Sequence, residues 1–186
     1  RKYPLVIDPV LIFASYSGST ADNFGMTATY GYDGSLFAGG TAFNVGYPTT
    51  LGALDSTFNG VPSSGITDVV ITRYDSTGAN LIYSTYIGGA QAETVHSIIA
   101  NTNNELYIYG ATSSTDFPVT STAYDTTFNG GSSLNFPNNG TTFNNGTDIY
   151  VAKINSAGTN LIGSTYIGGS ANDGVNHTVN QSYDTL

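Results

Sequence analysis

The sequence predicts an all-β protein built from β-propeller blades, each blade being a sheet of four antiparallel strands. The first observation is that one strand-forming segment occurs three times along the 186 residues. The second is the composition, in which 23 glycines and 14 tyrosines stand beside only 9% charged residues, against roughly 25% in a typical domain. The third is that no window has the apolar spacing of an amphipathic helix. Such a composition favours short strands joined by tight turns.

The repeated segment sets the organisation of the chain. Its three copies are LIFASY at 11–16, LIYSTY at 81–86 and LIGSTY at 161–166. Residues 11–60 align without a gap with residues 81–130, a shift of 70 residues. Later segments align only at a shift of 80, so the second copy carries ten extra residues within about 131–146.

We divide the chain on this basis into an opening segment and three repeats. Residues 1–10 are predicted to be the exit strand of an upstream domain or a linker, 11–80 the first blade, 81–160 the second blade, and 161–186 the start of a third. A propeller needs about four to eight blades to close. We therefore expect this chain to be part of a longer polypeptide, or its copies to associate so that blade faces are covered.

Each repeat is predicted to contain four short strands. In the second repeat the alternation of apolar and polar residues gives strands at 81–87, 95–100, 105–112 and 148–154. The repetition predicts the first of these strands again at 11–17. Residues 155–158 have the sequence of a type I turn, which leads directly into the next copy of the first strand. This direct connection favours a propeller; a β-sandwich built by duplication is the alternative fold.

The charge balance excludes several classes of partner. The net charge is −9 with only four Lys and Arg residues, so the chain lacks the basic stripe with which proteins bind nucleic acid or anionic membranes. The longest apolar run, near 4–15, contains Asp8 and Pro9 and is too short for a spanning helix. Cysteine is absent, which excludes disulfides and thiolate metal sites.

Three motifs of the second repeat resemble the bacterial SBBP (seven-bladed beta-propeller) repeat. They are YSTYIGG at 83–89, YGATSSTDFP at 109–118 and DIYVAKIN at 148–155. The opening YPLVIDP at 3–9 is similar to the strand that joins an upstream domain to the propeller in such proteins. The resemblance implies a secreted or cell-surface protein, often from Bacteroidetes that export through the type IX route. It implies no catalytic residues, so none is assigned.

The basic and imidazole side chains offer little chemistry. His96 and His177 are not repeat-equivalent, and we interpret them as solvent-facing strand residues rather than a metal pair or a catalytic base. Arg73 and Lys153 occupy the same position of the fourth strand in successive repeats. We expect both to be solvated residues on an outer strand.

The carboxylates follow the repeat as well. Asp68 and Asp148 both begin the fourth strand, and Asp55 and Asp125 share one loop position. A carboxylate that recurs in every blade indicates a structural role, such as accepting backbone N–H bonds at a turn, rather than a single active site.

No cofactor is assigned, and calcium in a loop of Gly and Asp is the alternative. Its candidate ligands are Asp173, beside Asn172 and Gly174, and Asp33, beside Gly34. No EF-hand spacing accompanies either carboxylate.

Two further kinds of site are predicted on loops. The insert is a candidate contact loop because it carries Phe136 and Phe143 among Asn and Gly residues. Hydroxyl glycosylation after Asp, the pattern expected for a Bacteroidetes protein, would fall on Ser56, Ser76, Thr126 and Thr185. The N-x-Ser/Thr pattern occurs at Asn139 and Asn145, among other sites.

We therefore predict a non-enzymatic secreted or cell-surface scaffold, serving adhesion, a fibre or an interaction module. Its expected partners are further blades or copies of itself, together with surface glycans or proteins. The alternative is part of a polysaccharide-active enzyme, or a carbohydrate-binding protein, with its site at the propeller axis or outside the propeller. A cluster of non-repeated carboxylates in one channel would favour the enzyme, whereas an exposed row of aromatic rings would favour carbohydrate binding.

Overall fold

A computed structural model describes residues 11–137 and 140–175, and over these residues the protein is all-β with no helix. The strands are β1 (Asn23–Tyr30), β2 (Leu36–Ala42), β3 (Asp68–Tyr74), β4 (Leu81–Ile87), β5 (Glu93–Ala100), β6 (Leu106–Thr112), β7 (Leu134–Phe136), β8 (Thr141–Phe143), β9 (Asp148–Ile154) and β10 (Leu161–Ile167). A helix able to cross a membrane is accordingly not found in the described residues.

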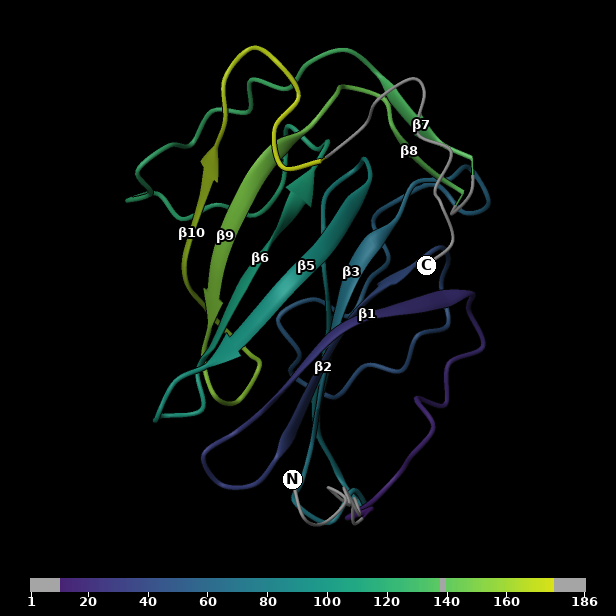
Figure 1. The fold of residues 1–186 in the computed structure, drawn as a ribbon, viewed down its shortest axis with the longest axis vertical. Helices are drawn as coiled ribbons and strands as arrows, with labels where there is room; N and C mark the ends of the chain where they lie inside the picture. Colours follow the sequence, from purple (N-terminus) through teal and green to yellow (C-terminus); the bar gives the residue numbers. More distant parts are fainter. Residues whose placement is uncertain (1–10, 138–139, 176–186) are drawn as a thin grey trace, which may run out of the picture.

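Two sheets of four antiparallel strands make up most of the molecule (Figure 1). Sheet A has the strand order β1-β2-β3-β4, and sheet B has the order β10-β9-β6-β5. A short hairpin, β7-β8, forms a separate third sheet. The prediction of an all-β protein with antiparallel sheets of four strands is confirmed.

The sheet borders fall one strand later than the repeat borders. The strand at 81–87 pairs with β3, to which it is joined by a tight turn in which Asp75 N–H donates to the Asn80 carbonyl at 3.0 Å. The turn after β9 is closed in the same way by Asn155 and Asn160. Each sheet therefore combines three strands of one repeat with the first strand of the next.

Residues 11–17 were predicted to form a strand, and this prediction is wrong. Their repeat-equivalents β4 and β10 are strands because they pair with β3 and β9. The described part of the chain offers no such neighbour to residues 11–17. Leu11, Ile12 and Tyr16 are accordingly exposed by 78%, 84% and 96%.

The same segment nevertheless keeps one tertiary contact of its repeat position. The ring of Phe13 lies directly against Gly78 in the turn after β3. The equivalent ring in β4, Tyr83, lies against Gly158 in the turn after β9. Residues near 11–17 thus pack on sheet A as β4 packs on sheet B.

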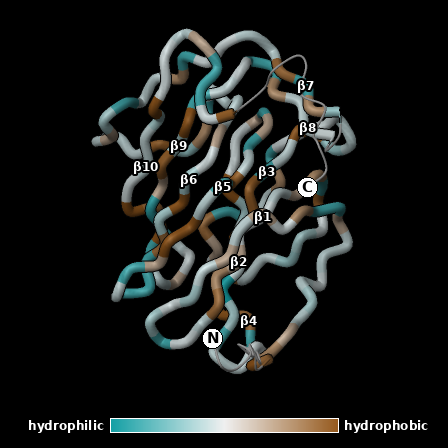
Figure 2. The backbone as a smooth tube through the Cα atoms, in the orientation of Figure 1, coloured by the Kyte–Doolittle hydropathy of each residue, from teal (hydrophilic) through white to brown (hydrophobic). Residues whose placement is uncertain are grey.

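The two large sheets pack face to face through alternating apolar residues. The inner face of sheet A contributes Phe37, Val69, Ile71, Tyr83 and Ile87. The inner face of sheet B contributes Val95, Ile98, Leu106, Ile108, Tyr150, Ala152 and Ile154. Gly39 on sheet A also faces sheet B, since a β-carbon there would lie 3.5 Å from the Ile98 side chain. Apolar residues accordingly lie along the strands and polar residues in the turns (Figure 2).

The long loops cover the sheets with the same aromatic contacts in both repeats. Tyr47 and Phe58 meet the ring of Tyr86 edge-on, with centroid distances of 6.2 and 6.1 Å. Phe117 and Phe128, their equivalents, approach Tyr166 to 6.3 and 5.9 Å. The loops are thus fixed by aromatic packing on the strands.

The β7-β8 hairpin lies within the insert predicted at about 131–146. It reaches back to the first repeat, where Thr142 N–H donates to the Gly65 carbonyl at 2.8 Å. This contact joins the second repeat to a loop of sheet A.

Candidate interaction face and buried carboxyl junction

Equivalent faces of the two sheets differ in exposure. On the inner face of sheet A, Phe37 and Ile71 are fully buried by sheet B. Their equivalents in sheet B are Tyr107, which is 44% exposed, and Val151, which is half-buried. We call this second surface the outer face of sheet B; it consists of Ile99, Tyr107, Tyr109, Val151 and Lys153. It presents aromatic and aliphatic side chains where sheet A has core.

The inner face of sheet A includes a socket that holds the turn between β9 and β10. The Arg73 Nη1 atom donates to the Ser156 carbonyl at 2.6 Å. The Leu54 N–H donates to the Gly158 carbonyl at 2.8 Å. The ring of Tyr83 closes the base of this turn socket against Gly158.

The equivalent socket on sheet B is open. Lys153, Tyr124 and Gly163 stand in the places of Arg73, Leu54 and Tyr83, and they line a groove of about 300 Å³. Tyr124 is 94% exposed. The groove has the position at which sheet A receives a turn.

Arg73 was expected to be solvated, and this is wrong. It is 5% exposed, pairs with Asp33 at 2.7 Å, and lies 4.9 Å from the centroid of Phe37. Sheet B covers it, which strand position alone does not reveal. Lys153 lies on the uncovered outer face and pairs with Glu105, whose hydrogen bond raises the pKa of the lysine.

The structural role predicted for the repeated carboxylates is confirmed. Asp68 accepts a bond from the Asn59 N–H at 2.7 Å, and Asp148 accepts the equivalent bond from Asn129 at 2.7 Å. In the loop before them, Asp55 accepts from the Thr57 N–H at 2.8 Å. Asp125 accepts from Thr127 at the same distance. Each carboxylate therefore fixes the loop that leads into its strand.

Glu93, at the start of β5, was not singled out from the sequence. It is fully buried, and its carboxyl accepts bonds from the Thr112 hydroxyl at 2.6 Å and the Gly89 N–H at 3.0 Å. Gly88 separates it from Asp68: a β-carbon on this glycine would lie 2.6 Å from the Glu93 carboxyl and 2.7 Å from that of Asp68. The two acids form a carboxyl junction between the sheets.

Burial favours the protonated forms of both acids in the junction. Burial raises the pKa of Glu93 to about 8 and that of Asp68 to about 7. The Oδ1 atom of Asp68 is buried and, within the described residues, has no hydrogen-bond partner that would stabilise a charge on it. Both side chains are shielded from solvent, so the junction can stabilise the fold but cannot reach a substrate.

The sequence repeat contains a pattern that could have drawn attention to Glu93. Asp173 is its equivalent at a shift of 80, and it accepts the Gly169 N–H at 2.9 Å as Glu93 accepts that of Gly89. Searching the repeat for positions that stay acidic, rather than identical, would have found this pair.

The two calcium candidates are both engaged within the chain. Asp173 binds the Gly169 N–H, and the neighbouring Asn172 accepts the Thr147 N–H at 3.0 Å. Asp33 binds the Arg73 guanidinium. Over 11–137 and 140–175, no three His, Cys, Asp or Glu side chains come together as a metal site would require. Calcium binding stays a prediction.

His96 lies on β5, where its ring is 5.7 Å from that of Tyr109 and 3.2 Å from the Thr94 hydroxyl. Burial lowers the pKa of His96. His177 falls outside the described residues, so the pairing of the two histidines is untested.

The predicted loop sites have different surroundings. Phe143 is only 2% exposed and meets the ring of Phe136 edge-on at 5.8 Å, so it packs inside the molecule rather than facing a partner. The predicted hydroxyl acceptors Ser56, Ser76 and Thr126 are exposed. The side-chain amide of Asn145 donates to the Ser113 carbonyl at 3.0 Å. Thr185 and Asn139 fall outside the described residues. Glycosylation at these positions stays a prediction.

Comparison with known proteins adds no relative. No protein-family model matches the chain, and no curated protein matches it.

Proposed function

We propose that this chain is a non-enzymatic secreted or cell-surface scaffold in which sheets of one repeat stack as the blades of a β-propeller. The observation that carries the proposal is the contrast between equivalent faces. Phe37 and Ile71 are buried by the next sheet, whereas Tyr107 and Val151 stand uncovered on the outer face of sheet B. The partner that fits this face is a further sheet of the same repeat.

The open groove on sheet B supports a specific mode of stacking. In sheet A the equivalent socket binds a turn through the backbone carbonyls of Ser156 and Gly158. Lys153 stands at the repeat position of Arg73, and beside its pairing with Glu105 its ammonium keeps a further N–H donor available to a carbonyl. A turn of the Asx-Ser-x-Gly type from another repeat would satisfy that donor and fill the groove.

The packing of residues 11–17 favours a propeller over a two-sheet sandwich. Phe13 contacts Gly78 in the turn after β3 as Tyr83 contacts Gly158 in the turn after β9. By the repeat, the Phe13 contact falls on the side of sheet A away from sheet B. A repeat contact on both sides of sheet A is expected for a ring of blades, whereas a sandwich ends after two layers.

The use of polar side chains supports a scaffold rather than an enzyme. Asp68, Asp148 and Arg73 are all occupied in contacts that hold loops and sheets together. The low charge of the surface and the motifs that resemble SBBP repeats support export to the cell surface. Adhesion or fibre formation is the role that such a scaffold would serve.

Self-association of the chain tests the proposal, because an uncovered face of this kind should find the same face or edge of another copy. We expect sedimentation velocity to detect concentration-dependent oligomers, and Tyr109→Glu on the outer face to reduce them at least tenfold. Val61→Glu, at a 57% exposed loop residue outside the strands, is the control and should leave association unchanged. A wild-type monomer that melts cooperatively at high temperature would contradict stacking and favour the duplicated sandwich.

A further inference from the structure

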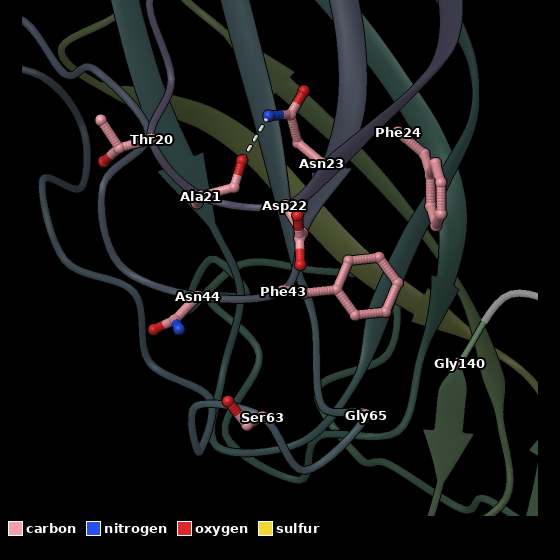
Figure 3. Close-up of a pocket in the computed structure, with 10 residues that line it drawn as sticks. All are labelled: Thr20, Ala21, Asp22, Asn23, Phe24, Phe43, Asn44, Ser63, Gly65 and Gly140. Atoms are coloured by element: carbon pink, nitrogen blue, oxygen red, sulfur yellow. Dashed lines mark hydrogen bonds between the residues drawn. The ribbon is translucent and has the colours of Figure 1, made fainter.

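A pocket of about 560 Å³ opens at the end of sheet A where β1 begins (Figure 3). Its walls come from the segment 20–24, from residues 43 and 44 after β2, from the loop at 63–65, and from Gly140 of the insert. The volume falls within the range of small-molecule sites. The pocket lies apart from the outer face of sheet B and from the carboxyl junction.

One wall of the pocket is aromatic. The rings of Phe24 and Phe43 meet edge to face, with centroids 5.3 Å apart and planes at 87°. Phe24 is 49% exposed, although it is a large apolar side chain. The two rings therefore offer an accessible apolar surface inside a polar rim.

The pocket also carries polar groups that are free to bind. In the described part of the chain, the Asp22 carboxylate, the Asn44 Nδ2 atom and the Ser63 hydroxyl make no hydrogen bond. The Asn44 Oδ1 atom is occupied by the Val45 N–H at 2.8 Å, which directs the amide nitrogen outward. Ser63 holds a positive φ of 63°, a conformation that non-glycine residues adopt at a cost.

The pocket exists because the first repeat departs from the second at this place. In sheet B the Ser113 hydroxyl accepts the Asn145 N–H at 3.0 Å, and the Asn145 side chain donates to the Ser113 carbonyl. These bonds join the loop after β6 to the loop before β9 at the equivalent place. In sheet A, Phe43 replaces Ser113 and Gly65 replaces Asn145, so neither bond can form. The aromatic wall and the opening are thus specific to the first repeat.

We propose that this pocket binds a neutral saccharide, a binding activity beyond the scaffold role. The C–H face of a pyranose ring packs on an aromatic side chain, while its hydroxyls both donate and accept. They would donate to Asp22 and accept from Asn44. An alkylammonium ion only donates and would leave the Asn44 amide unmatched. The described lining residues include no Lys, Arg or His, so nothing favours an acidic sugar.

Nuclear magnetic resonance titration of the intact chain tests this proposal. The probes are neutral oligosaccharides of glucose, galactose and N-acetylglucosamine, with butylamine as the cationic comparison. We expect at least one oligosaccharide to bind with a dissociation constant of a few millimolar or tighter, and to shift the amide signals of Asp22, Phe43 and Ser63.

Two variants and a control separate this pocket from binding elsewhere. Asp22→Asn, at an exposed residue, and Phe43→Ser, which installs the residue of the second repeat, should each weaken binding at least tenfold. Tyr109→Ala on the outer face of sheet B should leave it unchanged. The proposal is overturned if no oligosaccharide binds at 20 mM, if Asp22→Asn binds as the wild type does, or if butylamine alone shifts the pocket signals.

Discussion

Sheets A and B share a repeat, a strand order and a set of aromatic loop contacts, yet they differ in which surfaces are covered. Sheet A buries its inner face against sheet B, and Phe13 lies against the turn on its other side. Sheet B buries only one face and leaves Tyr107 and Tyr109 exposed by 44% and 38%. The comparison shows that the burial of a residue depends on whether another sheet covers it, and not only on its place in the strand.

The largest effect should come from truncating equivalent aromatic residues on the two sheets. Phe37→Ala removes a fully buried ring from between the sheets and should cost about 3–5 kcal/mol. Tyr107→Ala, at the same repeat position, should cost about 1 kcal/mol or less because the ring is 44% exposed. Urea denaturation of the two variants measures the difference. Equal losses would mean that the outer face is covered in solution.

A second comparison concerns glycines in paired strands. A β-carbon on Gly110 would clash with the Thr94 carbonyl and lie 2.6 Å from the Tyr150 hydroxyl, whereas nothing lies within 4 Å of one on Gly163. Gly110→Val should therefore lower the free energy of unfolding by about 3 kcal/mol, and Gly163→Val should have almost no effect. Thermal melts followed by circular dichroism compare them. Gly140 is a poorer control because its φ of +76° already disfavours a side chain.

The smallest effect, and one that depends on pH, is expected at the carboxyl junction. The pKa of Glu93 is raised from 4.5 to about 8, so the folded state binds the proton more tightly than the unfolded chain. The resulting stabilisation is complete below about pH 4.5 and is lost as the pH rises through 8. Glu93→Gln keeps an acceptor for the Gly89 N–H, and its amide N–H can donate to the Thr112 hydroxyl in place of the acid proton. This variant should flatten the fall in melting temperature between pH 5 and pH 8.5.

Asp173→Asn is the matched control in the second repeat. Asp173 is half-buried rather than enclosed, so its substitution should leave the pH profile as in the wild type. If Glu93→Gln retained the full pH dependence, Glu93 would not be its source, and the raised pKa of Asp68 would account for it.

Local features of the fold could be predicted from the sequence, and sheet membership could not. The strands at 81–87 and 148–154 were predicted at their observed bounds because alternation and repetition agree there. The pattern contains no information on which neighbour a strand pairs with, so residues 11–17 were assigned a strand although the described residues offer them no neighbour to pair with. Arg73 illustrates the same point for a side chain: its burial depends on a turn 83 residues away in the sequence.

The candidate sites were harder to predict because they arise from departures from the repeat. Glu93 and its repeat-equivalent Asp173 are both acidic but not identical, so a search for identical residues passes over them. The pocket depends on Phe43 standing where the second repeat has Ser113. The structural effect of such an exchange can be judged only when the positions of the surrounding loops are known.

The β-bulges of β1 and β5 change which side chains of these strands face the same side. Pairing shifts by one residue between Gly25 and Thr27, and again at the equivalent place between Val95 and Ser97. One residue in each strand, Met26 or His96, therefore has no partner of its own. The alternation of side chains is broken at this residue. Two residues an even number of positions apart normally lie on the same side of a strand, but they lie on opposite sides when the unpaired residue stands between them. A graft or deletion in either strand preserves its buried side only if the unpaired residue is counted separately.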